Sequence, residues 1–113
     1  IVIMKSSAER QEKEVYGVMR AIMRALRAFK TNRELAIRSL SRFLKVNDPE
    51  ALDETFRSHA KIFQDIPAPA LAGIRMVKDF LGQNDPKVAK LSVDEIVDMR
   101  FVDRLRREMG PGK

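Results

Sequence analysis

The stretch KEVYGVMRAIMRALRAFK, residues 13–30, decides the fold of this chain, because it has the pattern of one long amphipathic helix. At about 100° per residue, its apolar side chains collect on one stripe, while its arginines fall on the opposite side and face water. The stripe consists of Val15, Met19, Ile22, Leu26 and Phe29, with Val18 beside them. We therefore expect this helix to be the spine on which the shorter segments pack.

The composition is that of a folded protein, because 44% of the 113 residues are hydrophobic and 34% are charged, unlike a disordered tail. This length makes one domain with a modest core. No apolar run reaches the roughly 18 residues that a membrane span needs, and no signal peptide is evident. The absence of cysteine excludes disulfides and thiolate metal sites. The first residue is Ile1 rather than Met, which suggests a trimmed product.

The net charge of +6 is unevenly distributed. Residues 20–45 hold eight Lys or Arg and a single acid, Glu34, whereas residues 48–54 hold four acids. A basic block of this kind can attract an anionic partner at long range. A solvated helix face, partly neutralised by the acids that follow, is the commoner meaning of such a pattern, and we favour it.

Capping-box patterns predict where several helices begin. In this motif a Ser or Thr side chain accepts a hydrogen bond from the backbone of a Glu three residues later, and the Glu side chain reciprocates. The spacing occurs at Ser6, at Thr31 and at Ser92. We expect helices to start close to each of them, so the spine ends near Lys30 and a second helix follows.

Two aspartates predict two more helix starts. Asp48 precedes Pro49, whose missing N–H is no loss at the first helical position. Asp98 is placed to cap a final helix over residues 99–109, which Gly110 and Pro111 end.

Prolines at positions 67 and 69 predict an extended linker, since proline restricts both itself and the residue before it. A helix should follow, with an inner face of Leu71, Ile74, Val77 and Leu81 and with Phe80 beside it. Residues 1–4 would suit a short strand, although four residues cannot form a sheet alone. We therefore expect an all-α fragment of about five to six helices, with that short N-terminal strand, as a single helical domain over residues 1–113.

The sequence offers no catalytic residues, no metal ligands and no cofactor motif. His59 is the only histidine, and it shares a helical face with Leu52, Phe56 and Phe63, which indicates a packed or half-buried side chain rather than a ligand. No Gly-rich phosphate loop, Ser/His/Asp set or CxxC pair is present. We expect the chain not to be an enzyme.

Three stretches together resemble the C-terminal portion of periplasmic solute-binding proteins of ABC transporters, in the subgroup for nitrate, sulfonate, taurine and thiamine-precursor ligands. They are MRAIMRALRAFKTNRELAIRSLSRFLKVNDPEALDETF, IPAPALAGIRMVKDFLG and KLSVDEIVDMRFVDRLRREMG. The combination carries the resemblance: the Asn47-Asp48-Pro49-Glu50 helix start, the proline linker, and Val97-Asp98 followed by Arg100-Phe101-Val102 and Gly110.

The resemblance implies a parent of roughly three times this length with a two-lobed α/β fold, of which this chain would be the last part. It implies a periplasmic or cell-surface location, a small-molecule ligand in a cleft between lobes, and an ABC permease as partner. The family's ligand contacts lie largely upstream, so no ligand-binding residue is assigned here.

Two alternatives stay open. A basic all-helical nucleic-acid-binding module would use residues 20–45, although specific readers also need side chains for base edges or aromatic platforms, and Phe29 and Phe43 lie on apolar faces. We therefore expect no nucleic-acid partner. A biosynthetic enzyme related to the same family would need a nucleophile or cofactor lysine, which we do not find.

The last expectation is a homodimer of the fragment. Apolar side chains lie away from the main faces, and in a parent the first lobe and its sheet would cover them. We expect a second copy to cover them instead, with the N-terminal strand or the long helix at the interface. The residues concerned are Ile1, Val2, Ile3, Tyr16, Met23, Phe101, Val102, Leu105 and Met109.

Overall fold

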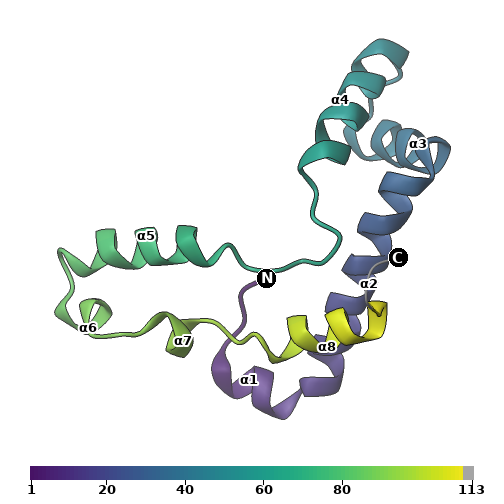
Figure 1. Ribbon diagram of the computed structural model, residues 1–113. Helices are drawn as coiled ribbons and strands as arrows, with labels where there is room; N and C mark the ends of the chain where they lie inside the picture. Colours follow the sequence, from purple (N-terminus) through teal and green to yellow (C-terminus); the bar gives the residue numbers. More distant parts are fainter. Residues whose placement is uncertain (111–113) are drawn as a thin grey trace. The chain divides into compact units, whose positions relative to one another are not determined.

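The computed structural model describes residues 1–110, and these residues form an all-helical chain, as predicted (Figure 1). Within this range there are eight helices, two of them only four residues long, and no strand. The helices are α1 (Lys5–Arg10), α2 (Glu12–Thr31), α3 (Arg33–Leu44), α4 (Pro49–Ile62), α5 (Leu71–Gly82), α6 (Pro86–Ala89), α7 (Val93–Ile96) and α8 (Arg100–Met109). The two four-residue helices, α6 and α7, raise the count above the five to six expected.

The chain divides into two compact units, and the boundary falls between Pro67 and Ala68. Residues 67–70 belong to no helix, as the two prolines predict. A proline has no N–H to give to a helix and forces the residue before it into an extended conformation, so no helix continues from one unit into the next. This linker therefore joins the two compact units of the helical chain.

The first unit is organised on α2, a helix of 20 residues, as predicted. The buried side chains of α2 are Val15, Met19 and Met23. These positions are four residues apart, so they form one row along the helix. The expectation that Met23 lies outside the apolar face, within an exposed patch, is wrong. Val18, which we expected beside the apolar stripe, is exposed.

The α2–α3 junction differs from the predicted cap by one residue. Asn32, not Thr31, is the N-cap of α3, and its side chain accepts a hydrogen bond from the Leu35 backbone N–H at 3.0 Å. Thr31 is the last residue of α2, and its hydroxyl donates to the Arg27 carbonyl at 2.8 Å. The Asn side chain is as good an N-cap as a Ser or Thr, and Thr31 already has a partner in the preceding helix.

The start of α4 follows the prediction in detail. The Asp48 carboxylate accepts hydrogen bonds from the backbone N–H groups of Glu50, at 2.9 Å, and Ala51, at 3.4 Å, and Pro49 is the first helical residue. The preceding helix ends at Leu44, where Lys45 adopts a left-handed conformation with φ of 56°. The break between the second and third predicted helices is therefore confirmed.

Replacing Asp48 by Ala should lower the free energy of unfolding of the first unit by about 1 kcal/mol, because two backbone donors lose their acceptor. Urea unfolding followed by circular dichroism, with amide exchange in α4, measures this loss. Asp48→Asn should retain most of the stability, since an Asn side chain also caps well. Equal losses for both variants would contradict the capping role.

The N-terminal strand predicted for residues 1–4 is absent from the described chain, because no other strand is there to pair with it. The first helix begins at Lys5, with Met4 in an extended conformation as its N-cap. Ser6 therefore lies inside the helix and does not cap it. The backbone N–H groups of Ser7 and Ala8 donate instead to the Met4 carbonyl, at 2.9 and 3.0 Å.

In the second unit, α6 and α7 fold back along α5 (Figure 1). Ser92 caps α7 through the predicted capping box: its hydroxyl accepts from the Glu95 N–H at 3.3 Å, and the Glu95 carboxylate accepts from the Ser92 N–H at 2.7 Å. The inner face predicted for α5 is largely wrong, because this helix has no buried residue and Leu71, Val77, Phe80 and Leu81 are all exposed. The two short helices that pack on it cover too little of its surface.

The last helix starts within two residues of Asp98, as predicted. Met99 is its N-cap by position, and the Asp98 carboxylate accepts from the Arg100 N–H at 3.1 Å. Gly110 ends the helix with a positive φ of 72°, whereas Pro111 lies outside the described residues. Phe101, Val102 and Leu105 are buried, so the expectation that they contribute to an exposed apolar patch is wrong.

Gly82 allows a test of packing in the second unit, and Gly17 in the first unit is its matched control. A Cβ added at Gly82 would come within 3.0 Å of the Ala89 Cα, whereas one added at Gly17, in α2, would meet nothing within 4 Å. Gly82→Ala should therefore weaken the α5–α6 contact by about 1–3 kcal/mol, despite the better helix propensity of alanine. Gly17→Ala should stabilise α2 by up to about 1 kcal/mol.

Amide exchange of α5 and α6 reports the first change, and that of α2 the second. A stabilising effect of Gly82→Ala would mean that α6 does not pack closely against the end of α5.

Candidate functional site

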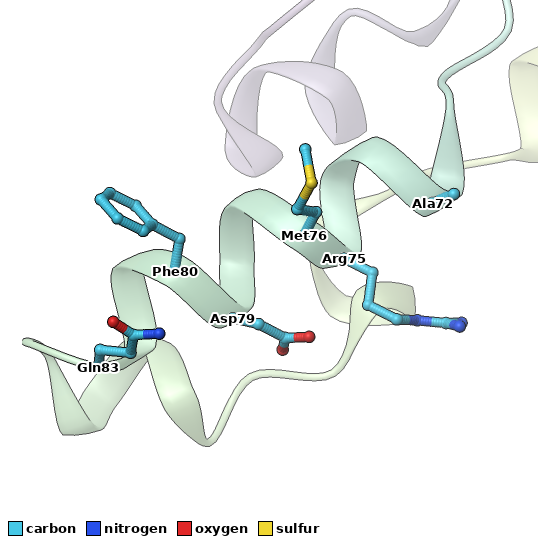
Figure 2. Close-up of a pocket in the computed structure, with 6 residues that line it drawn as sticks. All are labelled: Ala72, Arg75, Met76, Asp79, Phe80 and Gln83. Carbon is cyan, nitrogen blue, oxygen red and sulfur yellow. The ribbon is translucent and has the colours of Figure 1, made fainter.

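The most exposed apolar surface of the second unit lies on one side of α5. Met76 is 70% exposed and Phe80 is 65% exposed. They are four residues apart, so they lie one above the other on the helix. Figure 2 shows both side chains projecting from the same side of α5, with Arg75 and Asp79 together on a neighbouring side. A shallow hollow follows this surface and is lined by Ala72, Arg75, Met76, Asp79, Phe80 and Gln83.

This surface suits binding rather than catalysis. A flexible methionine next to an aromatic ring gives an adaptable apolar contact. Arg75 and Asp79 add one charge of each sign at the edge, so the hollow has no strong preference for a cation or an anion. Arg75, Met76 and Asp79 are not among the residues that the sequence pattern led us to expect on the inner face of this helix. The sequence feature that could have indicated this surface is the i, i+4 spacing of Met76 and Phe80. The two residues lie on the side of the helix opposite Ile74 and Lys78, which are half-buried.

His59 lies in an aromatic cluster of the first unit and is half-buried, as predicted. The ring of Phe29, on α2, lies 5.3 Å from both Phe56 and Phe63, centroid to centroid, and the His59 ring lies 5.4 Å from that of Phe63. The Nδ1 atom of His59 is 2.8 Å from the Thr55 carbonyl oxygen, so the bonded tautomer carries its proton on Nδ1. Its ring packs and hydrogen-bonds locally, which is a structural role.

Asp53 forms the central ion-pair cluster of the first unit. Its carboxylate accepts hydrogen bonds from the Arg33 side chain, one of them from Nε at 3.1 Å, and it also pairs with Arg57 one turn later on α4. The Arg33 hydrogen bonds, and then the positive charge of Arg57, hold the pKa of Asp53 below its usual 3.8. Because Arg33 opens α3 and Asp53 lies on α4, the cluster ties these two helices together.

Two further aspartates have lowered pKa values. The Lys30 ammonium lies 2.7 Å from the Asp65 carboxylate, and this hydrogen bond and charge lower the pKa of Asp65. In the second unit, hydrogen bonds from Arg100, the shortest at 2.7 Å, lower the pKa of Asp98. All three carboxylates are thus held in their charged form by a neighbouring cation, which is a stabilising arrangement and does not prepare a general acid or base.

These pKa shifts predict how stability depends on pH. For Asp53 and Asp65 the folded pKa lies below the unfolded value of 3.8, so the unfolded chain binds protons first as the pH falls. The contribution of these ion pairs to stability is complete above pH 3.8 and is lost as the pH falls through the lower folded values. Urea midpoints of the first unit should therefore decrease modestly below about pH 4, since these pairs are exposed to solvent.

Asp53→Asn should lower the midpoint at pH 7 and flatten this acid dependence. The matched control is Asp94→Asn on α7, because within the described residues Asp94 forms no ion pair. An unchanged acid slope in Asp53→Asn would contradict the role of this cluster.

The basic block of residues 20–45 is partly neutralised within the first unit. Several of its cations form ion pairs with carboxylates, among them Lys30 with Asp65, Arg33 with Asp53, and Arg38 with Glu34 at 3.4 Å. Arg33 pairs with Asp53 on α4, so the basic block and the acidic residues 48–54 meet there in space. Lys30 pairs with Asp65, which follows α4. The block therefore behaves in part as the solvated, internally neutralised face that the charge pattern favours.

Residues 1–110 hold no group of three or more His, Cys, Asp or Glu side chains that could bind a metal ion. Over the same range, every buried side-chain nitrogen or oxygen has a hydrogen-bond partner. None of the described helices combines the length and the apolar character that crossing a membrane requires.

Comparison with known proteins returned no match: no family profile, no curated protein and no solved structure is significantly similar to this chain.

Proposed function

We propose that this chain is the C-terminal helical part of an extracytoplasmic solute-binding protein, which binds a small ligand and delivers it to an ABC permease. The proposal starts from the sequence resemblance, which extends from about Tyr16 to Gly110. In this assignment the helices are a scaffold and a contact surface for the rest of the parent protein. The ligand-binding cleft and its contact residues belong to the lobes upstream.

The observation that carries the proposal is the state of residues 1–4. Ile1, Val2, Ile3 and Met4 are all exposed, Val2 fully, and this apolar run ends in an extended residue at Met4. Burying four such side chains is worth several kcal/mol at about 25 cal/mol per Å², so leaving them in water is costly. An extended apolar run that lacks a partner strand is what a sheet of a larger α/β parent would complete.

The proposal includes no reaction centre, because the charged side chains and the histidine described above have structural roles. The charged clusters around Asp53, Asp65 and Asp98 are ion pairs that stabilise the helices, and the only histidine is engaged in packing. We therefore propose a binding protein component rather than an enzyme, located outside the cytoplasmic membrane as in the family it resembles.

The first test is the genomic reading frame around this segment. We expect a longer frame with an export signal, adjacent to genes for a permease and an ATPase. A short frame without an export signal would overturn the proposal.

The second test uses the run of residues 1–4 directly. In the isolated chain, Val2→Asp should change stability by less than about 0.5 kcal/mol, because Val2 is fully exposed. In the longer parent the same change should cost well over about 1 kcal/mol, since it would place a charge inside a sheet covered on both faces. Glu9→Asp, at an exposed position on α1, is the control that should be neutral in both proteins.

The competing proposal is that the chain is a nucleic-acid-binding module. Titration with duplex and single-stranded DNA at two salt concentrations distinguishes this function from solute binding. Binding through several cations of the basic block would weaken steeply as salt rises, because counterions are released on binding. We expect no such binding, and tight salt-sensitive binding would favour the alternative.

A further inference from the structure

We propose that two copies of this chain pair through the outer face of α5, with the two helices antiparallel across a twofold axis. The face consists of Met76 and Phe80 at its centre and of Arg75 and Asp79 along one edge. This inference does not rest on the proposed function, and it places the dimer contact on an element other than the N-terminal run or the long helix.

The position of the apolar pair on α5 makes it available to a partner. Met76 and Phe80 lie on the side of the helix opposite its half-buried residues, Ile74 and Lys78. The end of the helix, at Gly82, is in close contact with Ala89 of α6. Ala72, one turn before Met76, is small and lines the same hollow, so a second helix can approach closely there. Among residues 68–110, the described part of the second unit, nothing covers Met76 or Phe80, which remain about two-thirds exposed.

The two edge charges determine the direction of the partner helix. Arg75 and Asp79 are four residues apart and lie on the same edge of the apolar pair (Figure 2). When two helices pack antiparallel across a twofold axis, the same edge of each helix meets its counterpart running the opposite way. Arg75 of one copy then lies near Asp79 of the second copy, and the same pair forms again on the other side of the axis.

A parallel arrangement lacks this complementarity. There the charged edge would face the other edge of α5, where Val77 and Leu81 lie, and both charges would lose water without a partner. In the single chain, Asp79 lies 3.3 Å from the Lys78 ammonium, its neighbour in sequence. In the antiparallel pair Arg75 of the second copy would supply a second cation to the same carboxylate.

The size of the face determines how strong the pairing can be. A helix of 12 residues is about 18 Å long, so the contact buries less than the roughly 1,200 Å² of a standard stable interface. Because the interface is isologous, each contact nevertheless occurs twice. The chain should therefore be monomeric at low concentration and should dimerise reversibly as the concentration rises.

Sedimentation equilibrium from micromolar to millimolar concentration tests the proposal. We expect the weight-average mass to rise from 12.9 kDa towards twice that value. Phe80→Ser should abolish the rise. Phe43→Ser is the matched control, because Phe43 lies in the first unit and is 84% exposed, and this variant should dimerise like the natural chain. A chain that stays monomeric throughout, or a dimer that survives Phe80→Ser, would overturn the proposal.

Exchange of the edge charges tests the antiparallel geometry. Arg75→Asp and Asp79→Arg each bring like charges together across the axis, so each should weaken dimerisation at least about tenfold. The double variant R75D/D79R restores opposite charges and should recover most of the affinity. Helix content from circular dichroism, equal in all variants, shows that the fold is intact. Failure of the double variant to recover affinity while its helix content is unchanged would refute the antiparallel pairing.

Discussion

The contact between Phe29 and the aromatic face of α4 is the interaction on which the first unit depends. Phe29 lies in the last turns of α2, and its ring touches both Phe56 and Phe63. These residues are 27 and 34 positions later in the sequence, so the contact closes the α3–α4 hairpin back onto the end of the long helix. It adds to the packing of α3 on α2 and on α4, where Ala36 and Leu52 are buried.

The electrostatic contacts of this unit act around the same point. Lys30 pairs with Asp65 next to the aromatic cluster. Arg33, the first residue of α3, pairs with Asp53 on α4. Each pair joins the region where α2 ends and α3 begins to α4 or the residues just after it. Exposed ion pairs of this kind contribute little individually, so they adjust the orientation of helices that apolar packing brings together. They also use part of the positive charge that would otherwise be available to an anionic partner.

The second unit has a different basis for its stability. Its longest helix, α5, has no buried residue, and the two helices that pack on it are one turn each. Around α5, local devices therefore carry more of the structure, whereas α8 has three buried side chains. These devices are the capping box of Ser92 and Glu95, the Asp85 side chain that caps α6, and the close approach at Gly82. A unit built in this way leaves apolar surface on α5 for another molecule. Met76 and Phe80 are the most exposed large apolar side chains of this unit.

Several features of this protein were determined by the sequence alone. Helix starts at Asp48 and Ser92 depend on a side chain and the backbone N–H groups two or three residues away, so local spacing is sufficient to predict them. The long helix and the proline linker are equally local, since periodicity and a missing N–H do not depend on distant residues. The half-buried state of His59 follows from its place on the apolar face of one helix.

Only the tertiary structure decided which apolar residues are buried. Met23 is buried and Val18 exposed, although both are apolar residues of the same amphipathic helix, because burial depends on where the neighbouring elements pack. Residues 1–4 have the composition of a strand, but residues 1–110 contain no strand that could pair with them. Asp53 meets Arg33 only because the α3–α4 turn brings them together. The exposed face of α5 likewise results from the short length of α6 and α7. Periodicity shows that a helix has an apolar side, but the packing of other elements determines whether that side is covered.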